Sequence, residues 1–138
     1  MISQTQCTSF KAELYTGVHN LSSDVLKIAL YTSDATLNQD TTAYTSTGEV
    51  VGTGYTAGGQ ALGNVTIGSS GYTAYVSFDN PIWYNTAFTV RGALLYNSTK
   101  ANRAIAVIDF GTYKIASGTF TITMPPNTAT TAILRSSN

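Results

Sequence analysis

The sequence predicts an all-β fold, a jelly-roll-like antiparallel β-sandwich with one short N-terminal helix. Only 10% of the 138 residues are charged, whereas 11% are aromatic and threonine is abundant. Thr, Tyr, Val and Ile pack well on a pleated, half-buried surface, so this composition favours strands. Segments of alternating apolar and polar residues recur with turn signals about every 8 to 12 residues, which is typical of sandwiches and barrels. We expect Greek-key connections between the strands.

The length of the chain corresponds to one domain. A chain of 138 residues buries enough surface to fold independently. We find no internal repeat, heptad pattern or linker that would divide it. The sequence therefore predicts a single β-sandwich domain over residues 1–138, with flexible ends at 1–7 and 136–138, because short polar termini are poorly ordered unless something holds them.

Residues 8–19 form the one expected helix. Thr8 or Ser9 can accept hydrogen bonds from the free N–H groups of the first turn. The apolar residues of this segment recur on one face of a helix, as a helix that packs on a core requires. We expect Gly17 to end it.

The first half of the chain contains one strong strand and two weaker ones. Residues 24–31 are apolar on both faces, interrupted only by Lys27, which is typical of a central strand. Residues 32–71 are rich in Thr, Gly, Ser and Asn, and too many glycines are present for a helix. We expect short strands around 48–55 and 60–67, joined by a turn at the Gly58–Gly59 pair.

The second half of the chain alternates more regularly. Residues 72–78 alternate strictly between apolar and polar side chains, as a half-buried strand requires. Pro81 then interrupts the pattern, since proline lacks the N–H that a strand ladder uses. Further strands are expected at 86–96, 102–111, 119–124 and 131–135.

Charge and cysteine content exclude several classes of protein. Seven Lys and Arg balance seven Asp and Glu, so no overall field attracts nucleic acid or an acidic membrane. Cys7 is the only cysteine, which leaves no disulfide within the chain and no cysteine-based zinc cluster. No apolar run is long enough for a membrane span, and the start of the chain does not look like a secretory signal. We expect no nucleic-acid or membrane partner, and synthesis in a cytoplasm.

Residues that could carry chemistry are few. His19 lies at the expected end of the helix, where an imidazole can bond terminal carbonyls. Asp34 and Asp40 lack the ordered spacing of a calcium loop. Glu49 and Asp79 are the acids considered for glycoside cleavage, which needs two carboxyl groups facing each other, but both are expected to be solvated turn acids. We therefore expect no catalytic residue, no cofactor and no metal.

Arg91 is the one charge in the middle of an expected strand. It either points to solvent, which is the favoured interpretation, or pairs with an acid such as Asp109 on the neighbouring strand.

Aromatic residues are the better candidates for contacts with a partner. Trp83 and Tyr84 follow Pro81 and are either core residues or contact anchors, with the core favoured for Trp83. Tyrosines in polar loops are expected to be exposed, and the N-terminal segment is expected to order on a partner. The expected partner-interface residues are Ile2, Phe10, Tyr44, Tyr55, Trp83, Tyr84 and Tyr113.

Five segments together resemble small virion structural proteins of tailed bacteriophages. The most specific are GTGYTAGGQ at 52–60 and YNSTKANRAIAVIDFG at 96–111, and the resemblance spans nearly the whole chain. It implies a head-associated decoration or cement protein that binds the major capsid protein on the capsid surface. Such a protein would be made in the host bacterial cytoplasm, would have no enzymatic activity, and would self-associate as a trimer or dimer, because exposed strand edges are covered by copies of the chain or by the shell.

Two other functions remain open at this point. A tail, adaptor or fibre component would use the same fold for attachment or for contact with host-surface glycans, through exposed Trp and Tyr in a groove. A small hydrolase or lectin-like enzyme would require Glu49 and Asp79 to converge in a pocket.

Overall fold

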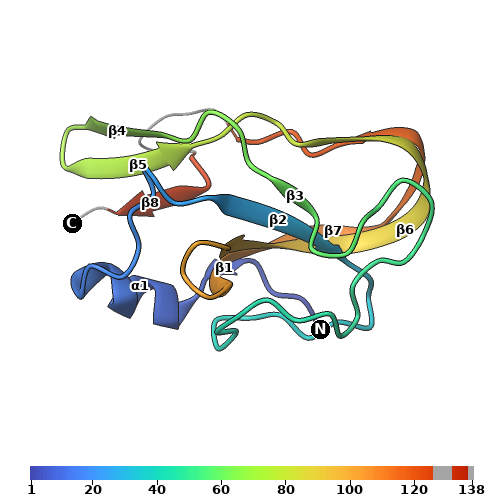
Figure 1. Cartoon of the computed structure of the whole chain (residues 1–138), viewed down its shortest axis with the longest axis horizontal. Coiled ribbons are helices and arrows are strands. Elements are labelled where there is room, and N and C mark those ends of the chain that lie inside the picture. The colour runs from blue at the N-terminus through green and yellow to red at the C-terminus, as the bar shows by residue number, and fades with distance from the viewer. Residues whose placement is uncertain (126–131, 137–138) are drawn as a thin grey trace.

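The computed structural model describes residues 1–125 and 132–136, and these form two antiparallel sheets and one short helix (Figure 1). This confirms the prediction of an all-β chain with a short N-terminal helix. The elements are β1 (Thr5–Gln6), α1 (Thr8–Tyr15), β2 (Leu26–Tyr31), β3 (Gln60–Ala61), β4 (Thr66–Ser70), β5 (Thr73–Ser77), β6 (Ile82–Asn97), β7 (Arg103–Thr121) and β8 (Leu134–Ser136).

Two pairs of strands, β4–β5 and β6–β7, are hairpins, whereas the pairs β1–β7, β2–β6 and β5–β8 join strands that are distant in the sequence. The larger sheet has the order β1-β7-β6-β2-β3 and the smaller has the order β4-β5-β8, and every pair is antiparallel. In Figure 1, β4, β5 and the start of β6 lie along the upper side of the molecule, whereas β2 and β1 lie below them. Over the described residues the sheets do not close into a barrel.

The long hairpin of β6 and β7 connects the upper and lower layers. Its register jumps between Val90 and Gly92, whose partners are Lys114 and Asp109. Between these two pairs β6 has one residue, Arg91, whereas β7 has four, 110–113. Extra residues on one strand form a bulge, which bends and twists the sheet. Figure 1 shows both strands turning back together at the right of the view. The strand predicted at 102–111 and the first half of the one predicted at 119–124 are thus parts of one strand, whereas residues 122–124 lie beyond its end. The sequence pattern did not reveal this.

The core is built around β2. This strand is buried on both faces, as its apolar run predicts, and it pairs with β6 from Leu26↔Asn97 to Tyr31↔Gly92. An aromatic group fills the bent end of the hairpin, where the rings of Trp83, Phe88 and Phe110 lie with centroids 5.9, 6.0 and 6.1 Å from that of Phe120. Such spacings suit tilted and edge-on ring contacts.

The N-terminal segment is part of the fold. Ile2 is only 4% exposed and forms a parallel bridge with Leu37, and the Met1 amino group donates to the carbonyl of Ala35 at 3.1 Å. A side chain at Gly92 would collide with Ile2, so the glycine provides the space that Ile2 occupies. The expectation of a flexible 1–7 arm is therefore wrong. At the other end Ser136 pairs with Ala74, and residues 137–138 lie outside the described part of the chain.

Helix α1 is shorter than predicted. It ends at Tyr15, and Gly17 follows with φ of +74°, a left-handed conformation that favours glycine and terminates helices. The residue at the N-cap is Cys7, without a side-chain capping bond, and the Ser9 hydroxyl has no hydrogen-bond partner among the described residues. The prediction of a Thr8 or Ser9 cap is wrong.

The glycine-rich stretch is a loop that wraps the core. In place of the strand predicted at 48–55 there are two single bridges, Tyr31↔Glu49 and Thr53↔Ala87. Gly59 lies so close to β2 that a Cβ there would sit 1.8 Å from the carbonyl oxygen of Ile28, so only glycine fits. We refer to residues 44–60 as the strap. The strand predicted at 60–67 is divided between β3 and β4, and the one predicted at 131–135 begins later, as β8, with residue 131 outside the described part.

Candidate functional site

The strap is held by a buried carboxylate. Glu49 accepts hydrogen bonds from the hydroxyl of Tyr44 at 2.6 Å, from the backbone N–H of Gly58 at 2.8 Å and from the hydroxyl of Tyr55. The Tyr55 hydroxyl in turn accepts from the N–H of Leu30 on β2 at 3.0 Å. A buried carboxylate with this many donors is well satisfied and fixes the loop that supplies them.

Two further tyrosines donate hydrogen bonds to backbone carbonyls of the strap. Tyr31 donates to the carbonyl of Thr45 at 2.6 Å, and Tyr96 donates to that of Gly58 at 2.5 Å. Burial, together with the bond to the Glu49 carboxylate, raises the pKa of Tyr44 to about 12. The phenol therefore keeps its proton and remains a donor over the ordinary pH range.

This arrangement corrects three predictions. Tyr44 and Tyr55 were expected as exposed contact residues, but they are half-buried and their hydroxyls are used inside the molecule. Glu49 was expected to be a solvated turn acid and is instead buried. Asp79, in contrast, is exposed as expected, and its carboxylate accepts a hydrogen bond from the side-chain amide of Asn64 at 2.6 Å.

A second buried polar cluster joins α1 to the hairpin. Asn97, fully buried, donates from Nδ2 to the Asp24 carboxylate at 2.7 Å and contacts Nδ1 of His19 at 2.9 Å. Its Oδ1 accepts from the backbone N–H groups of Thr99 and Lys100, which fixes the orientation of the amide. Nδ1 of His19 is therefore an acceptor, and Nε2 carries the ring proton.

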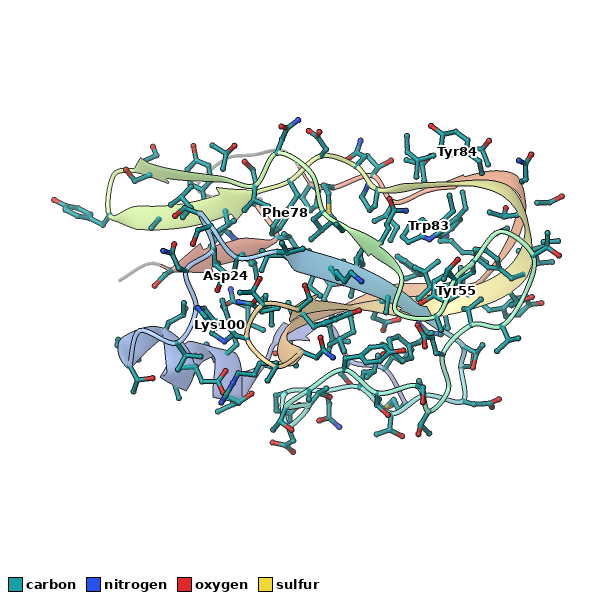
Figure 2. All side chains as sticks on the ribbon, in the orientation of Figure 1. Asp24, Tyr55, Phe78, Trp83, Tyr84 and Lys100 are labelled. Atoms are coloured by element: carbon teal, nitrogen blue, oxygen red, sulfur yellow. The ribbon has the colours of Figure 1, made fainter. Side chains whose placement is uncertain are left out.

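Two carboxylates, those of Glu13 and Asp24, complete this hydrogen-bonded cluster. Nε2 of His19 donates to Glu13 at 2.8 Å, and Arg103 donates to the other oxygen of Glu13 at 2.6 Å. Lys100 binds Asp24 at 3.1 Å, and both side chains lie between α1 and the hairpin turn in Figure 2. His19 was predicted to bond the terminal carbonyls of the helix, but its ring reaches side chains instead. All of its polar atoms are used, which indicates a structural role.

One exposed face of the bent hairpin carries no charged residue. On β6, Trp83, Thr86, Phe88 and Val90 point inward, and the residues alternating with them are exposed. The outer face, as we name it, consists of the exposed residues Ile82, Tyr84, Ala87, Thr89, Ile115, Ser117, Thr119 and Thr121. Cross-strand pairs such as Thr89↔Ile115 and Ala87↔Ser117 hold these side chains in register. Figure 2 shows Tyr84 and Trp83 on opposite sides of β6.

Of the remaining predicted interface residues, two are exposed and three are buried. Tyr84 is 63% exposed, in the outer face, and Tyr113 is 60% exposed, in the segment that β7 adds at the bend. Ile2, Phe10 and Trp83 are at most 6% exposed and belong to the core, so they are not contact residues of this chain on its own. Phe10 is buried because α1 lays it against the His19 ring, with centroids 5.0 Å apart.

Ile115 is a large exposed apolar residue that the sequence pattern did not single out. It is 75% exposed on β7, and the alternation of residues 115–121 would have shown its face had this stretch been recognised as a strand.

A cleft of about 690 Å³ opens between α1 and the smaller sheet. Its lining is mostly apolar and includes Leu14 of α1 and Ile67 and Val76 of the sheet. Two tyrosines, Tyr15 and Tyr75, also line it. A partly apolar cleft of this size is within the range that binds small ligands.

Arg91 pairs with Asp109 across the register jump, which is the alternative that the sequence analysis left open for it. Both side chains are about one quarter exposed, so the pair contributes modestly to stability.

No group of three His, Cys, Asp or Glu side chains within 1–125 and 132–136 is placed to hold a metal ion. Asp34 and Asp40 stand in turns where the Thr32 hydroxyl and the Asn38 amide accept from their backbone N–H groups. The helix in the described part of the chain is too short and too polar to cross a bilayer.

Comparisons with models of protein families, with curated proteins and with solved structures found no match to this chain.

Proposed function

We propose that this chain is a non-enzymatic virion structural protein of a tailed bacteriophage, a capsid decoration or cement protein that binds and stabilises the shell of the major capsid protein. The observation that carries the proposal is the outer face, a rigid, exposed, uncharged surface that includes Tyr84 and Ile115. Large exposed apolar and aromatic residues gathered on one sheet face are typical of contact surfaces. The buried polar clusters, by contrast, are satisfied internally.

The resemblance of residues 52–60 and 96–111 to virion structural proteins supplies the class of partner. A cement protein needs a stiff scaffold and a contact surface. The scaffold is supplied by the two sheets, to which the strap is bound through the Leu30–Tyr55 and Tyr96–Gly58 hydrogen bonds. In this proposal the sheets stack as a jelly-roll-like sandwich. The protein is made in the bacterial cytoplasm and ends on the capsid surface.

Electron microscopy of the virion that carries this chain tests the placement. Density for the chain on the outside of the shell is the expected result. Density confined to the tail, or none in the particle, contradicts it.

Binding of the purified protein to shells that lack it tests the outer face. Tyr84→Glu places a charge in the face and is expected to weaken binding at least tenfold, since a charge buried without a partner is costly. Tyr72→Glu is the matched control, because Tyr72 is 87% exposed on the turn between β4 and β5, outside the face. Equal loss in both variants would contradict the assignment of the surface.

The cleft between α1 and the smaller sheet favours a second candidate function, a tail, adaptor or fibre component that contacts glycans. Tyr15 and Tyr75 in its lining offer ring faces on which a sugar can stack. Binding to a glycan array that is lost in Tyr75→Ala and retained in Tyr72→Ala would support this function over the first.

A further inference from the structure

The second half of β7 has an open edge. Residues 114–121 pair with β6 on one side, from Val90↔Lys114 to Ile82↔Thr121. On the other side β1 covers only Ala106 and Val107, and no described residue pairs with the backbone of 114–121. A row of free N–H and C=O groups of this length is a template for another strand.

The amino-acid composition of this edge favours pairing with another strand. Proteins usually protect exposed edges with charges, proline or very short strands. Residues 114–121 include one charge, Lys114, and no proline, and their exposed side chains are mainly β-branched or small. The other strands with an open side among the described residues are shorter: β1 and β3 have two residues each, β8 three and β4 five.

We infer that two copies of this chain join through residues 113–121 of β7, antiparallel about a two-fold axis near Ser117, to form one continuous sheet. With Ser117 facing its own copy, Ile115 faces Thr119 and Tyr113 faces Thr121. Cross-strand pairs of aromatic and β-branched residues are favourable. A two-fold interface must be complementary to itself, and this stretch meets that condition.

The charge of the chain is compatible with pairing to a second copy of itself. The chain carries seven Lys and Arg against seven Asp and Glu, so two copies do not repel each other at long range. In the proposed register the two Lys114 positions are about 20 Å apart, well beyond the screening length of about 8 Å at physiological salt. Gly118 has φ of +88°, a left-handed backbone beside the register shift between Trp83 and Thr86, so the ladder of the proposed sheet is bulged on both sides of Ser117.

Sedimentation across a dilution series tests the dimer. The wild-type chain is expected to sediment as a dimer that dissociates on dilution, and a monomer at every concentration would overturn the inference. Ser117→Lys brings two ammonium groups together at the axis and is expected to give a monomer with an unchanged circular dichroism spectrum. The matched control is Ser69→Lys on the exposed edge strand β4. A dimer that survives Ser117→Lys, or that is lost in Ser69→Lys, would also overturn it.

A cross-link provides a second readout if the lysine variant fails to fold. Residues that face each other in antiparallel strands have Cα atoms about 4.5 to 5.5 Å apart, which a disulfide can span. Ser117→Cys is therefore expected to form a disulfide-linked dimer under mild oxidation, whereas Ser69→Cys is not. The native Cys7 is fully buried and leaves the background low. Failure of Ser117→Cys to cross-link would contradict the register. The inference does not depend on where the protein lies in a virion.

Discussion

Asn97 donates a hydrogen bond from its side-chain amide to Nδ1 of His19 at 2.9 Å, and neither side chain is open to solvent. This bond joins the end of β6 to the segment that follows α1, 78 residues earlier in the chain. Because the other end of the amide is held by backbone N–H groups, the contact also sets the tautomer of the imidazole. The amide therefore supports the docking of the helix, together with the Arg103–Glu13 pair and the buried Phe10.

Asn97→Ala is expected to lower the free energy of unfolding by about 2 to 4 kcal/mol, because His19 and Asp24 each lose a buried partner. Urea denaturation measures the change. Ser69→Ala, an exposed truncation on β4 without a hydrogen bond to lose, should change it by less than about 0.5 kcal/mol. A similar small effect for Asn97→Ala would show that the cluster does not stabilise the fold.

Acid is expected to weaken the same cluster. Burial raises the pKa of Glu13, but hydrogen bonds from His19 and Arg103 outweigh it and hold the pKa below its ordinary 4.5. The Asp24 pKa is likewise raised by burial and, on balance, lowered below 3.8 by bonds from Asn97, the Asn20 N–H and Lys100. The native state thus binds fewer protons than the unfolded state, and the stability present above these ordinary values is lost as pH falls through the folded pKa values.

The measurement is the free energy of unfolding against pH for the wild type and for Glu13→Gln. We expect the difference between them to be largest above pH 4.5 and to shrink as the pH falls below that value. A difference that stays constant down to low pH would show that the Glu13 carboxylate is not held in its charged form by its partners.

Glu49→Ala is expected to cost about 2 to 4 kcal/mol of stability, since the hydroxyls of Tyr44 and Tyr55 and the N–H of Gly58 lose their acceptor. Hydrogen exchange should show the loss of protection concentrated in the strap. Asp79→Ala is the control, because its partner Asn64 is exposed and the loss should be small. Uniform loss of protection across the molecule in Glu49→Ala would contradict a local role.

Deletion of residues 1–7 is expected to lower the melting temperature by several degrees, because it removes Ile2 from the core and β1 from the sheet. A flexible arm would leave the melting temperature unchanged. Calorimetry of the deletion variant beside Ile2→Ala separates the two, and the point variant should account for a substantial part of the shift.

Cys7 is expected to be inert in the folded protein. Burial raises the pKa of its thiol to about 11, and only the thiolate reacts quickly with disulfide reagents. A chromogenic thiol reagent should therefore register no free thiol at pH 8 until denaturant is added, and then one per chain. Rapid labelling of the native protein would contradict the burial.

Local patterns in the sequence account for much of the fold. The apolar run of 24–31 predicted a strand buried on both faces, and the alternation of 72–78 predicted β5. Gly17 predicted the end of the helix. Each of these features depends on residues a few positions apart, so the pattern of side chains along the chain is enough to reveal it.

The candidate contact residues could not be sorted in the same way. Tyr44 and Tyr84 are both expected interface residues, yet one donates to a buried carboxylate and the other stands on the outer face. What decides between them is the segment packed on each side chain, and that segment comes from elsewhere in the chain.

The sequence by itself determined the class of the protein: a chain poor in charge and rich in β-branched and aromatic residues, without the side chains for a disulfide or a cysteine-based zinc site. Only the tertiary structure decided that Ile2 is core, that Arg103–Thr121 is one bent strand, and that part of one edge of this strand is open among the described residues. Alternation sets the two faces of a strand locally, whereas burial and strand pairing depend on which distant segment lies beside it.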